Sequence, residues 1–227
     1  MIFRSGTVID VTEVLPLMRQ IRISVPSLQG ASLPPSQHIR VSVGAERLTL
    51  RTYSVRYYDS QQGIIDLYTH LHGKGPGSQW ASTVHKGDQV EFLGPKGSLA
   101  IIPNAPYHLF VGEETASVAI HSMLEALPEK ASVMGYLETT RPGEEVPYNG
   151  PHPLPWVYRY EAPASTSTTL VEAVRSLALP DSPGVAYLAG EALTCQAVRR
   201  YLINEKRWSR TAIRVKPFWT PGKTGLD

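Results

Sequence analysis

The chain lacks the sulfur that several protein classes require. It contains one cysteine, Cys195, which excludes an internal disulfide framework and a thiolate-bound iron–sulfur cluster, because each needs several sulfur atoms. A single thiol fits a reducing compartment, so we expect a cytoplasmic protein. The spacing around Cys195 puts it on the apolar side of a predicted helix, which favours a small core residue over a reactive thiol.

Long apolar runs and runs of one charge are also missing. No segment approaches the roughly 20 apolar residues that cross a bilayer, and residues 1–11 have no apolar stretch of signal-peptide length, so no stable membrane insertion is expected. The formal net charge is only +2. No basic run interleaved with aromatic residues is present, so nucleic acid is not an expected partner. The composition leaves the oligomeric state open.

The histidines have no compact spacing of the kind that binds a metal ion. We interpret them as packing or hydrogen-bonding residues and expect no protein-bound metal. The residues considered are His38, His70, His72, His108 and His121.

Residues 1–103 have the pattern of an antiparallel β-barrel. Short stretches rich in strand-forming residues are separated by turn clusters such as Pro34-Pro35-Ser36, which is typical of small closed β-folds. The expected strands are 7–14, 19–25, 38–43, 50–58, 64–72 and 88–93.

Residues 104–227 have a different pattern, in which apolar strands alternate with helical stretches. This alternation predicts a parallel-sheet α/β domain with a C-terminal tail. The expected strands are 107–111, 132–137, 185–189 and 213–218, and the expected helices are 115–127, 168–177 and 191–205. Between them, residues 139–155 and 162–167 are rich enough in Pro, Gly and Ser to be surface loops.

One predicted strand, residues 50–58, contains groups suited to a flavin in its stretch 51–56. The guanidinium of Arg51 can grip a phosphate, the ring and hydroxyl of Tyr53 can face the isoalloxazine and ribityl chain, and Ser54 can hydrogen-bond near the reactive flavin nitrogen. Taken alone, the stretch fits an ordinary exposed barrel edge better than it fits a flavin site.

A glycine-rich stretch follows about twenty residues later. Gly73, Gly75 and Gly77 remove side chains so that the backbone can approach pyrophosphate oxygens, and Ser78 adds a hydroxyl ahead of a helix expected to begin near residue 79. A plain turn is the alternative, since Gly and Pro punctuate any hairpin.

Two strand-to-helix turns in the second half suggest a dinucleotide site. After Gly112, free N–H groups and the hydroxyl of Thr115 can face a phosphate, although Thr115 is equally suited to cap its helix. Gly190-Glu191 repeats the arrangement, and the carboxyl ends of parallel strands are where such sheets bind ligands. This pairing favours NAD(P)H, without the Gly-x-Gly-x-x-Gly fingerprint. Glu138 suits a ribose hydroxyl and Arg141 suits a 2′-phosphate, so the choice between NADH and NADPH stays open.

The order of these segments resembles the siderophore-interacting protein family of FAD-dependent ferric-siderophore reductases, which are ferredoxin-reductase-like. The resemblance extends through Gly94-Pro95-Lys96-Gly97 and Phe218-Trp219 to Gly222-Lys223. The family more often has Ala at the position of Gly77 and Asp at that of Glu113. The resemblance implies that FAD binds the barrel and NAD(P)H the α/β domain, and that electrons pass to a ferric siderophore.

The resemblance also implies which residues contact each cofactor. For FAD these are Arg51, Tyr53, Ser54, Arg56, His72, Gly73, Gly75, Pro76, Gly77, Ser78 and Trp80. For NAD(P)H they are Gly112, Glu114, Thr115, Ala116, Gly190 and Glu191.

Many ferric siderophores are anionic, so cations are expected to guide them. Arg40 and Lys223 are the candidates, with solvated surface charge as the alternative for each. Two other functions stay open, namely a general flavin reductase or electron-transfer flavoprotein with another acceptor, and a siderophore-binding or iron-storage protein without a redox cofactor.

Overall fold

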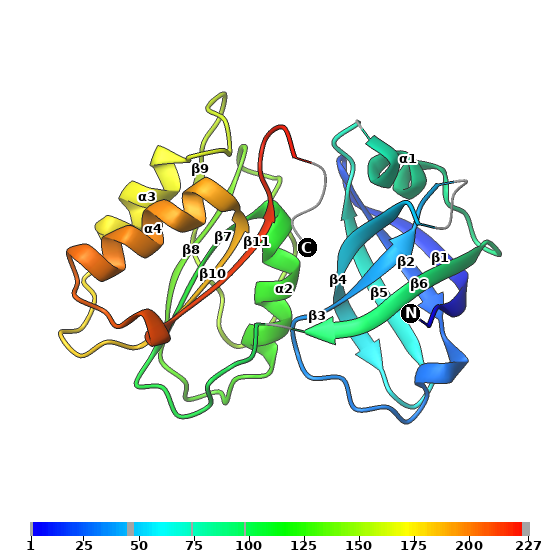
Figure 1. The fold of residues 1–227 in the computed structure, drawn as a ribbon, viewed down its shortest axis with the longest axis horizontal. Coiled ribbons are helices and arrows are strands. Elements are labelled where there is room, and N and C mark those ends of the chain that lie inside the picture. The colour runs from blue at the N-terminus through cyan, green and yellow to red at the C-terminus, as the bar shows by residue number, and fades with distance from the viewer. Residues whose placement is uncertain (1, 45–47, 74, 98, 224–227) are drawn as a thin grey trace. The chain divides into compact units, whose positions relative to one another are not determined.

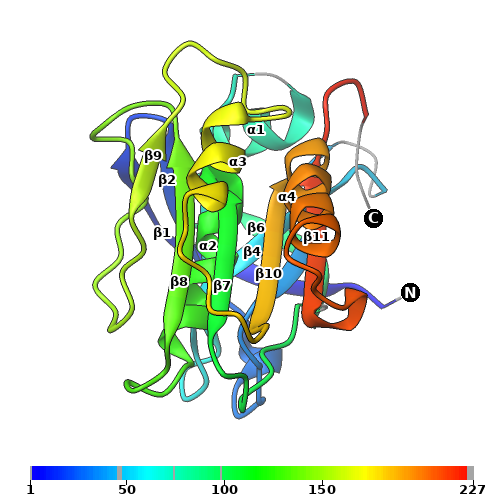
Figure 2. The ribbon, with the colours of Figure 1, turned by 90° about the vertical axis from the view of Figure 1, so that its left-hand side faces the viewer.

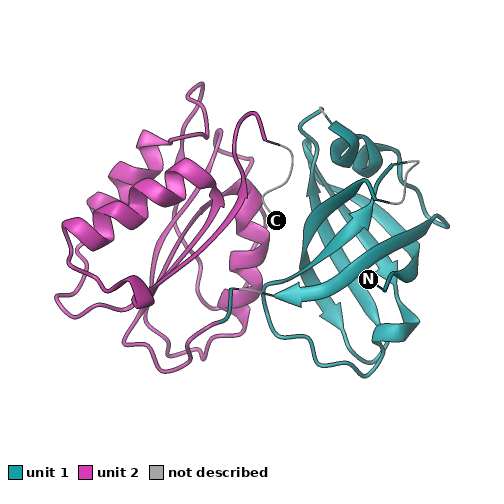
Figure 3. Cartoon of the chain, in the orientation of Figure 1, with its two compact units in different colours: residues 1–100 teal, residues 101–227 magenta. Residues whose placement is uncertain are grey.

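The structure, a computed structural model, describes residues 2–44, 48–73, 75–97 and 99–223. The chain forms two compact units, residues 1–100 and 101–227 (Figure 3). The boundary expected from the sequence, between residues 103 and 104, differs from this division by three residues.

The first unit is a closed antiparallel barrel, as predicted (Figure 1). Its strands follow one another around the barrel in the order β1-β2-β5-β4-β3-β6, and β6 closes it by pairing with the start of β1. The strands are β1 (Arg4–Leu15), β2 (Met18–Ser24), β3 (Gln37–Ser42), β4 (Leu50–Asp59), β5 (Ile64–His70) and β6 (Gln89–Gly97).

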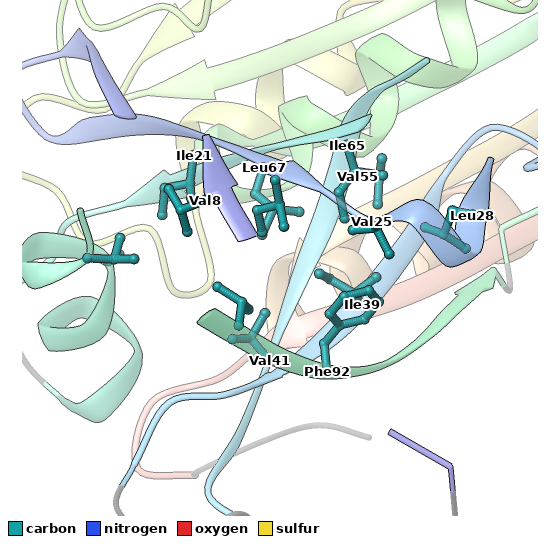
Figure 4. Close-up of a cluster of buried hydrophobic side chains, with 14 residues drawn as sticks. Val8, Ile21, Val25, Leu28, Ile39, Val41, Val55, Ile65, Leu67 and Phe92 are labelled. Atoms are coloured by element: carbon teal, nitrogen blue, oxygen red, sulfur yellow. The ribbon is translucent and has the colours of Figure 1, made fainter. Parts of the chain in front are cut away.

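The barrel is filled by the inward-facing aliphatic side chains of alternate strand positions (Figure 4). Ile21, Ile39, Ile65, Leu67 and Phe92 have no exposed surface. Each such side chain contributes about 1.5–3 kcal/mol relative to an exposed one, so this interior fixes the strands that surround it.

Helix α1 (Gly75–Thr83) packs on the barrel through Ala81, with Val84 just beyond its end. Arg19 of β2 donates from Nη1 to the carbonyl oxygens of Ala81 and Ser82, both at 2.8 Å. These bonds satisfy carbonyls that a helix end leaves open, and a cation is favourable there.

The predicted start of this helix near residue 79 is wrong, because α1 begins at Gly75. Pro76 explains the difference. A proline in the first turn has the right φ and lacks only an N–H that the helix does not use. Most of the glycine-rich stretch therefore belongs to the first turn of α1.

The second unit is a parallel five-stranded sheet with helices on both faces, which confirms the predicted α/β fold. Figure 2 shows the strands in their spatial order, β11-β10-β7-β8-β9. They are β7 (His108–Glu113), β8 (Val133–Thr139), β9 (Trp156–Tyr158), β10 (Val185–Glu191) and β11 (Ile213–Trp219). The short strand β9 was not predicted, since three residues are too few to show an alternation.

Helix α2 (Glu114–Glu125) lies on one face of this sheet, and α3 (Thr168–Arg175) and α4 (Ala192–Asn204) lie on the other (Figures 1 and 2). The chain leaves β7 toward β8 and β9, then returns to β10 and β11 on the opposite side. The order therefore reverses between β7 and β10, and such a switch point opens a crevice at the carboxyl ends of the strands. Among the described residues, no helix combines the length and apolar character needed to cross a bilayer.

Gly135 and Gly143 provide a matched test of how tightly the sheet is packed. Gly135 of β8 has φ +134°, and a Cβ there would overlap the Phe110 carbonyl of β7, whereas Gly143 has φ +91° and open space around it. We expect Gly143→Ala to lower the free energy of unfolding by about 1 kcal/mol through backbone strain alone. Gly135→Ala should cost roughly 3 kcal/mol or more, because strain and overlap add.

Urea unfolding of the two variants, followed by circular dichroism, measures the difference. Equal midpoints for the two would show that β7 and β8 can separate enough to admit a methyl group.

Candidate functional site

The two segments predicted to hold a flavin pack directly on each other. The Tyr53 hydroxyl donates to the Gly77 carbonyl at 2.9 Å, and the Tyr53 ring lies 5.3 Å from that of Trp80 between centroids. A Cβ at Gly77 would lie 2.9 Å from the Tyr53 hydroxyl and 3.0 Å from Cγ of Arg51. Burial raises the pKa of Tyr53, so the phenol stays a neutral donor. Glycine at position 77 thus lets β4 contact the start of α1.

The stretch leading into α1 has the open, left-handed backbone that an anion-binding turn uses. Gly73 has φ +73° and Gly75 has φ +80°, and nothing lies within 4 Å of a Cβ at either position. The Gly73 N–H donates to Oγ of Ser78 at 3.0 Å. The first turn of α1 contains no acidic residue, and His72 before it is exposed. This helix start therefore presents positive character beside the aliphatic part of Arg51.

The remaining predicted flavin residues lie on the other side of β4. Ser54 pairs with His38 of β3, and Thr52 pairs with Arg40, so Ser54 and Arg40 share the face opposite to Arg51 and Tyr53. The Arg56 guanidinium lies 6.0 Å from the centre of the Tyr68 ring. Strand β4 thus directs predicted binding residues to two faces.

In the second unit, Gly112 ends β7 where α2 approaches closely. A Cβ at Gly112 would lie 2.7 Å from Cβ of Ala116 and 2.8 Å from Cδ1 of Ile120, and Ala116 is fully buried. These small residues therefore set the distance between strand and helix.

The free donors expected at Thr115 are already occupied. Glu113 caps α2, with its carboxylate accepting the Thr115 N–H at 2.7 Å and the Thr115 hydroxyl at 2.5 Å. Thr115 is therefore not the cap of α2, because the preceding Glu113 occupies that position.

Glu191 fills the same position at α4. It accepts the Thr194 N–H at 2.8 Å, the Thr166 N–H at 3.1 Å and the Thr220 hydroxyl at 3.0 Å. Burial alone would raise the pKa of Glu191, but these and other backbone N–H groups hold it below its usual value. With 1% of its surface exposed, Glu191 is a buried carboxylate with an internal role.

The pKa of Glu113 is raised, in contrast to that of Glu191. It is 1% exposed, and burial together with the charge of Glu114 raises its pKa to about 7, against the hydrogen bonds from Thr115 and the Trp219 indole. The indole N–H of Trp219 donates to Oε1 of Glu113 at 3.0 Å. Glu113 therefore titrates near neutral pH.

An ion pair occupies Glu114, another predicted nucleotide residue. Arg159 donates to its two carboxylate oxygens at 2.7 and 2.5 Å, and lies 3.5 Å from Glu138. Glu138 is fully buried and accepts the Ser167 hydroxyl, so it does not reach the surface to meet a ribose. The side chain of Arg141 is 57% exposed and contacts Glu144 and Glu161 at 3.5 and 3.8 Å.

A small pocket lies between the ends of β7 and β10, at the switch point of the sheet. Its polar lining consists of Glu113, Glu191, Thr194 and Cys195, and Gly112 contributes backbone. Lys223 is exposed and follows β11 in a turn, in which its N–H donates to the Thr220 carbonyl at 3.4 Å. Within the part of the chain that the structure describes, no three His, Cys, Asp or Glu residues gather in a metal-binding group.

Three residues of this region were absent from the predicted site, namely Glu113, Arg159 and Trp219. A signal existed for Glu113, because an acidic residue directly before a helical stretch is a favourable cap. Arg159 reaches Glu114, and Trp219 reaches Glu113, from distant parts of the chain, and no local pattern identifies such contacts.

Comparison with known proteins assigns both units. Residues 105–222 match the model of the siderophore-interacting protein family. The chain belongs to this family. Residues 32–99 match the siderophore-interacting FAD-binding domain, which confirms the prediction of an FAD-binding barrel.

Individual proteins similar to this chain have names related to siderophores. The ferric vibriobactin reductase ViuB of Vibrio cholerae is 31% identical over 176 residues, which cover 76% of this chain and 65% of ViuB. The chain thus spans about two thirds of that relative. The siderophore-interacting protein SipS of Aeromonas hydrophila is 26% identical, with a TM-score of 0.84 over 98% of this chain and 93% of SipS. A siderophore utilization protein from T. fusca has the same fold, at 24% identity and a TM-score of 0.87, over 100% of this chain and 95% of that one.

Cys195 tests the description of the pocket, because it is the chain's one thiol. Burial, with the charges of Glu113 and Glu191, raises its pKa to about 12. At pH 8 we therefore expect almost no reaction with Ellman's reagent in the native protein and full reaction of one thiol per chain in guanidinium. Rapid labelling of the native chain would mean that the pocket opens to solvent.

Proposed function

We propose that the protein is a ferric-siderophore reductase that uses FAD and takes its electrons from NAD(P)H. The observation that carries the proposal is the packing of Arg51 and Tyr53 of β4 against the glycine-rich start of α1. It lies in the barrel whose residues match the siderophore-interacting FAD-binding domain. FAD, when bound, supplies a carrier that accepts two electrons as a hydride and releases them singly.

The residues of the first unit fit the chemical parts of FAD. A pyrophosphate needs backbone N–H groups and a cation, which the first turn of α1 and Arg51 would provide. The contrast with the second unit supports this placement, since α2 and α4 begin at the carboxylates Glu113 and Glu191, whereas the first turn of α1 has no acid. On the other face of β4, Ser54 and Arg56 are proposed to contact the flavin.

The carboxyl edge of the sheet, at the switch point between β7 and β10, is proposed to receive NAD(P)H. Because both adjoining helix starts hold carboxylates, repulsion disfavours a phosphate there and favours the uncharged carboxamide and ribose of the nicotinamide half. Gly112 and Gly190 would let this half approach the backbone. The phosphates would need cations farther along the edge, and the exposed Arg141 at the end of β8 is the candidate.

The iron is substrate and needs no protein ligand. Siderophores hold Fe(III) through hard oxygen donors, which bind Fe(II) much less tightly, so reduction loosens the metal. Arg40 and Lys223 are proposed to attract the anionic complex before electron transfer.

Replacing Arg51 tests the FAD site. Arg51→Ala should weaken FAD binding roughly tenfold or more, since a charge-assisted contact to phosphate is worth about 1.5–3 kcal/mol. The measurement is FAD binding by the purified chain, followed by flavin fluorescence. Lys86→Ala is the matched control, because it removes an exposed positive charge from a turn of the same unit and should leave FAD affinity unchanged. Unaltered affinity in Arg51→Ala would remove the phosphate-binding role.

Turnover separates the proposed reaction from its alternatives. The FAD-loaded protein should be bleached by NADH or NADPH without oxygen, and adding a ferric siderophore should restore the flavin absorbance while an Fe(II) chelator develops colour. Recovery with free FMN or a one-electron protein acceptor only would indicate a general flavin reductase. A chain that takes up a siderophore and no FAD would indicate a binding protein.

A further inference from the structure

The two glutamates that cap α2 and α4 also hold the C-terminal segment, defined here as Trp219, the last residue of β11, and Thr220 after it. Oε1 of Glu113 accepts the Trp219 indole N–H, and Oε1 of Glu191 accepts the Thr220 hydroxyl, each at 3.0 Å. The caps themselves are made by bonds from Thr115 and Thr194. The bonds to Trp219 and Thr220 are therefore additional to capping, and they fasten two consecutive residues.

Glu113 reaches Trp219 by crossing a strand. The sheet order is β11-β10-β7, so Glu113 at the end of β7 and Trp219 at the end of β11 are separated by the end of β10. Gly190 occupies that place with φ +112°, and a Cβ there would lie 2.5 Å from Oε1 of Glu113. The missing side chain at position 190 thus makes room for the carboxylate.

We propose that Glu113 is a positioning residue for the C-terminal segment, holding Trp219 beside the switch-point pocket as a carboxylate and releasing it when protonated. Glu113 itself lines the pocket, so the state of this one side chain determines both the pocket wall and the segment attached to it. The consequence for nucleotide binding, given below, rests on the proposed function.

The hydrogen-bond pattern determines where the proton goes. Oε2 faces the Thr115 N–H, which can only donate. Oε1 meets the Thr115 hydroxyl and the Trp219 indole N–H, and a hydroxyl can turn from donor to acceptor. A proton taken from water therefore settles on Oε1 and is donated to Oγ of Thr115. Oε1 of the neutral acid keeps a lone pair but is a weaker acceptor than the carboxylate, so the bond from the indole N–H weakens and Trp219 is freed to move.

The charged and titratable neighbours favour uptake of the proton. Glu114 is the first residue of α2, Glu191 ends β10 and Cys195 lies on α4, and none of these is a cation. Arg159, after β9, attracts the Glu113 carboxylate but is bound to Glu114. β11 presents the uncharged indole. With the pKa of Glu113 at about 7, Trp219 is held above neutral pH and released below it, while Glu191, whose pKa is lowered, still accepts the Thr220 hydroxyl.

The Trp219 indole N–H resonance of the full-length chain tests this directly. It is assigned by its absence in Trp219→Phe and followed from about pH 5.5 to about pH 8.5, with the Trp80 and Trp208 indoles as internal references. We expect the Trp219 signal to move from a hydrogen-bonded to a free position as pH falls, with a midpoint near 7. A pH-independent signal overturns the proposal.

Two variants identify the titrating group. Glu113→Gln cannot take up the proton, so the Trp219 titration should vanish, and a midpoint that survives in it overturns the proposal. Glu113→Asp is one methylene shorter and still a good helix cap. It should keep α2 intact by circular dichroism and leave the indole free at every pH, since it does not reach across Gly190. A hydrogen-bonded indole in that variant also counts against the proposal.

Kinetics of the FAD-loaded enzyme test the consequence for turnover. If the segment positions the nicotinamide half, Glu113→Asp should raise KM for NAD(P)H roughly threefold or more with a smaller change in kcat, as expected for loss of a binding contact. An unchanged KM overturns the link to the nucleotide. The resonance experiment needs no turnover, so it tests the role of Glu113 even if the protein fails to reduce ferric siderophores.

Discussion

The unpaired N–H groups at the start of a helix need a hydrogen-bond acceptor. In this protein the nature of that acceptor differs between α1 of the first unit and α2 and α4 of the second. α2 and α4 begin at Glu113 and Glu191, whose carboxylates accept the first N–H groups. α1 begins with glycine and proline and has no acid in its first turn. The first N–H groups of α2 and α4 are therefore bonded by carboxylates of the chain itself, whereas the start of α1 is suited to an external anion. The proposed roles of both units follow from this distribution.

Because Glu113 and Glu191 cap α2 and α4, the carboxyl edge of the sheet has to recognise a nucleotide in another way than through these helix starts. The sheet has the strand order of dinucleotide-binding folds, in which a phosphate commonly sits at a helix N-terminus beside a glycine turn. Here the glycines at 112 and 190 serve packing. Gly112 admits α2, and Gly190 admits the carboxylate of Glu113. Recognition would then depend on neutral contacts at the switch point and on cations farther along the edge of the sheet.

Much of the fold was readable from the sequence because it is encoded locally. Turn clusters delimit the six barrel strands, and the change of sequence pattern after residue 103 marks the α/β unit. The sequence also singled out the segments that meet at β4 and α1, as a proposed flavin site, since the glycines and Arg51 have recognisable chemistry. The predicted start of α1 was too late because the glycines were interpreted as a turn, although Pro76 is typical of a first helical turn. Three contacts were not predicted: the bonds from Thr115 to Glu113, from Arg159 to Glu114 and from Trp219 to Glu113. They depend on the local turn geometry and the strand order, which residue types alone do not determine.

The Glu113 side chain passes over Gly190 at the end of β10. The residue types at positions 113 and 190 therefore constrain each other in members of this family. A chain that gains a side chain at 190 has to shorten or turn aside the acid at 113, and a chain with a shorter acid no longer needs that space. Substitutions at these positions are therefore expected to occur together, 77 residues apart in sequence. Such a correlated pair would identify which members of the family fasten their final strand in this way.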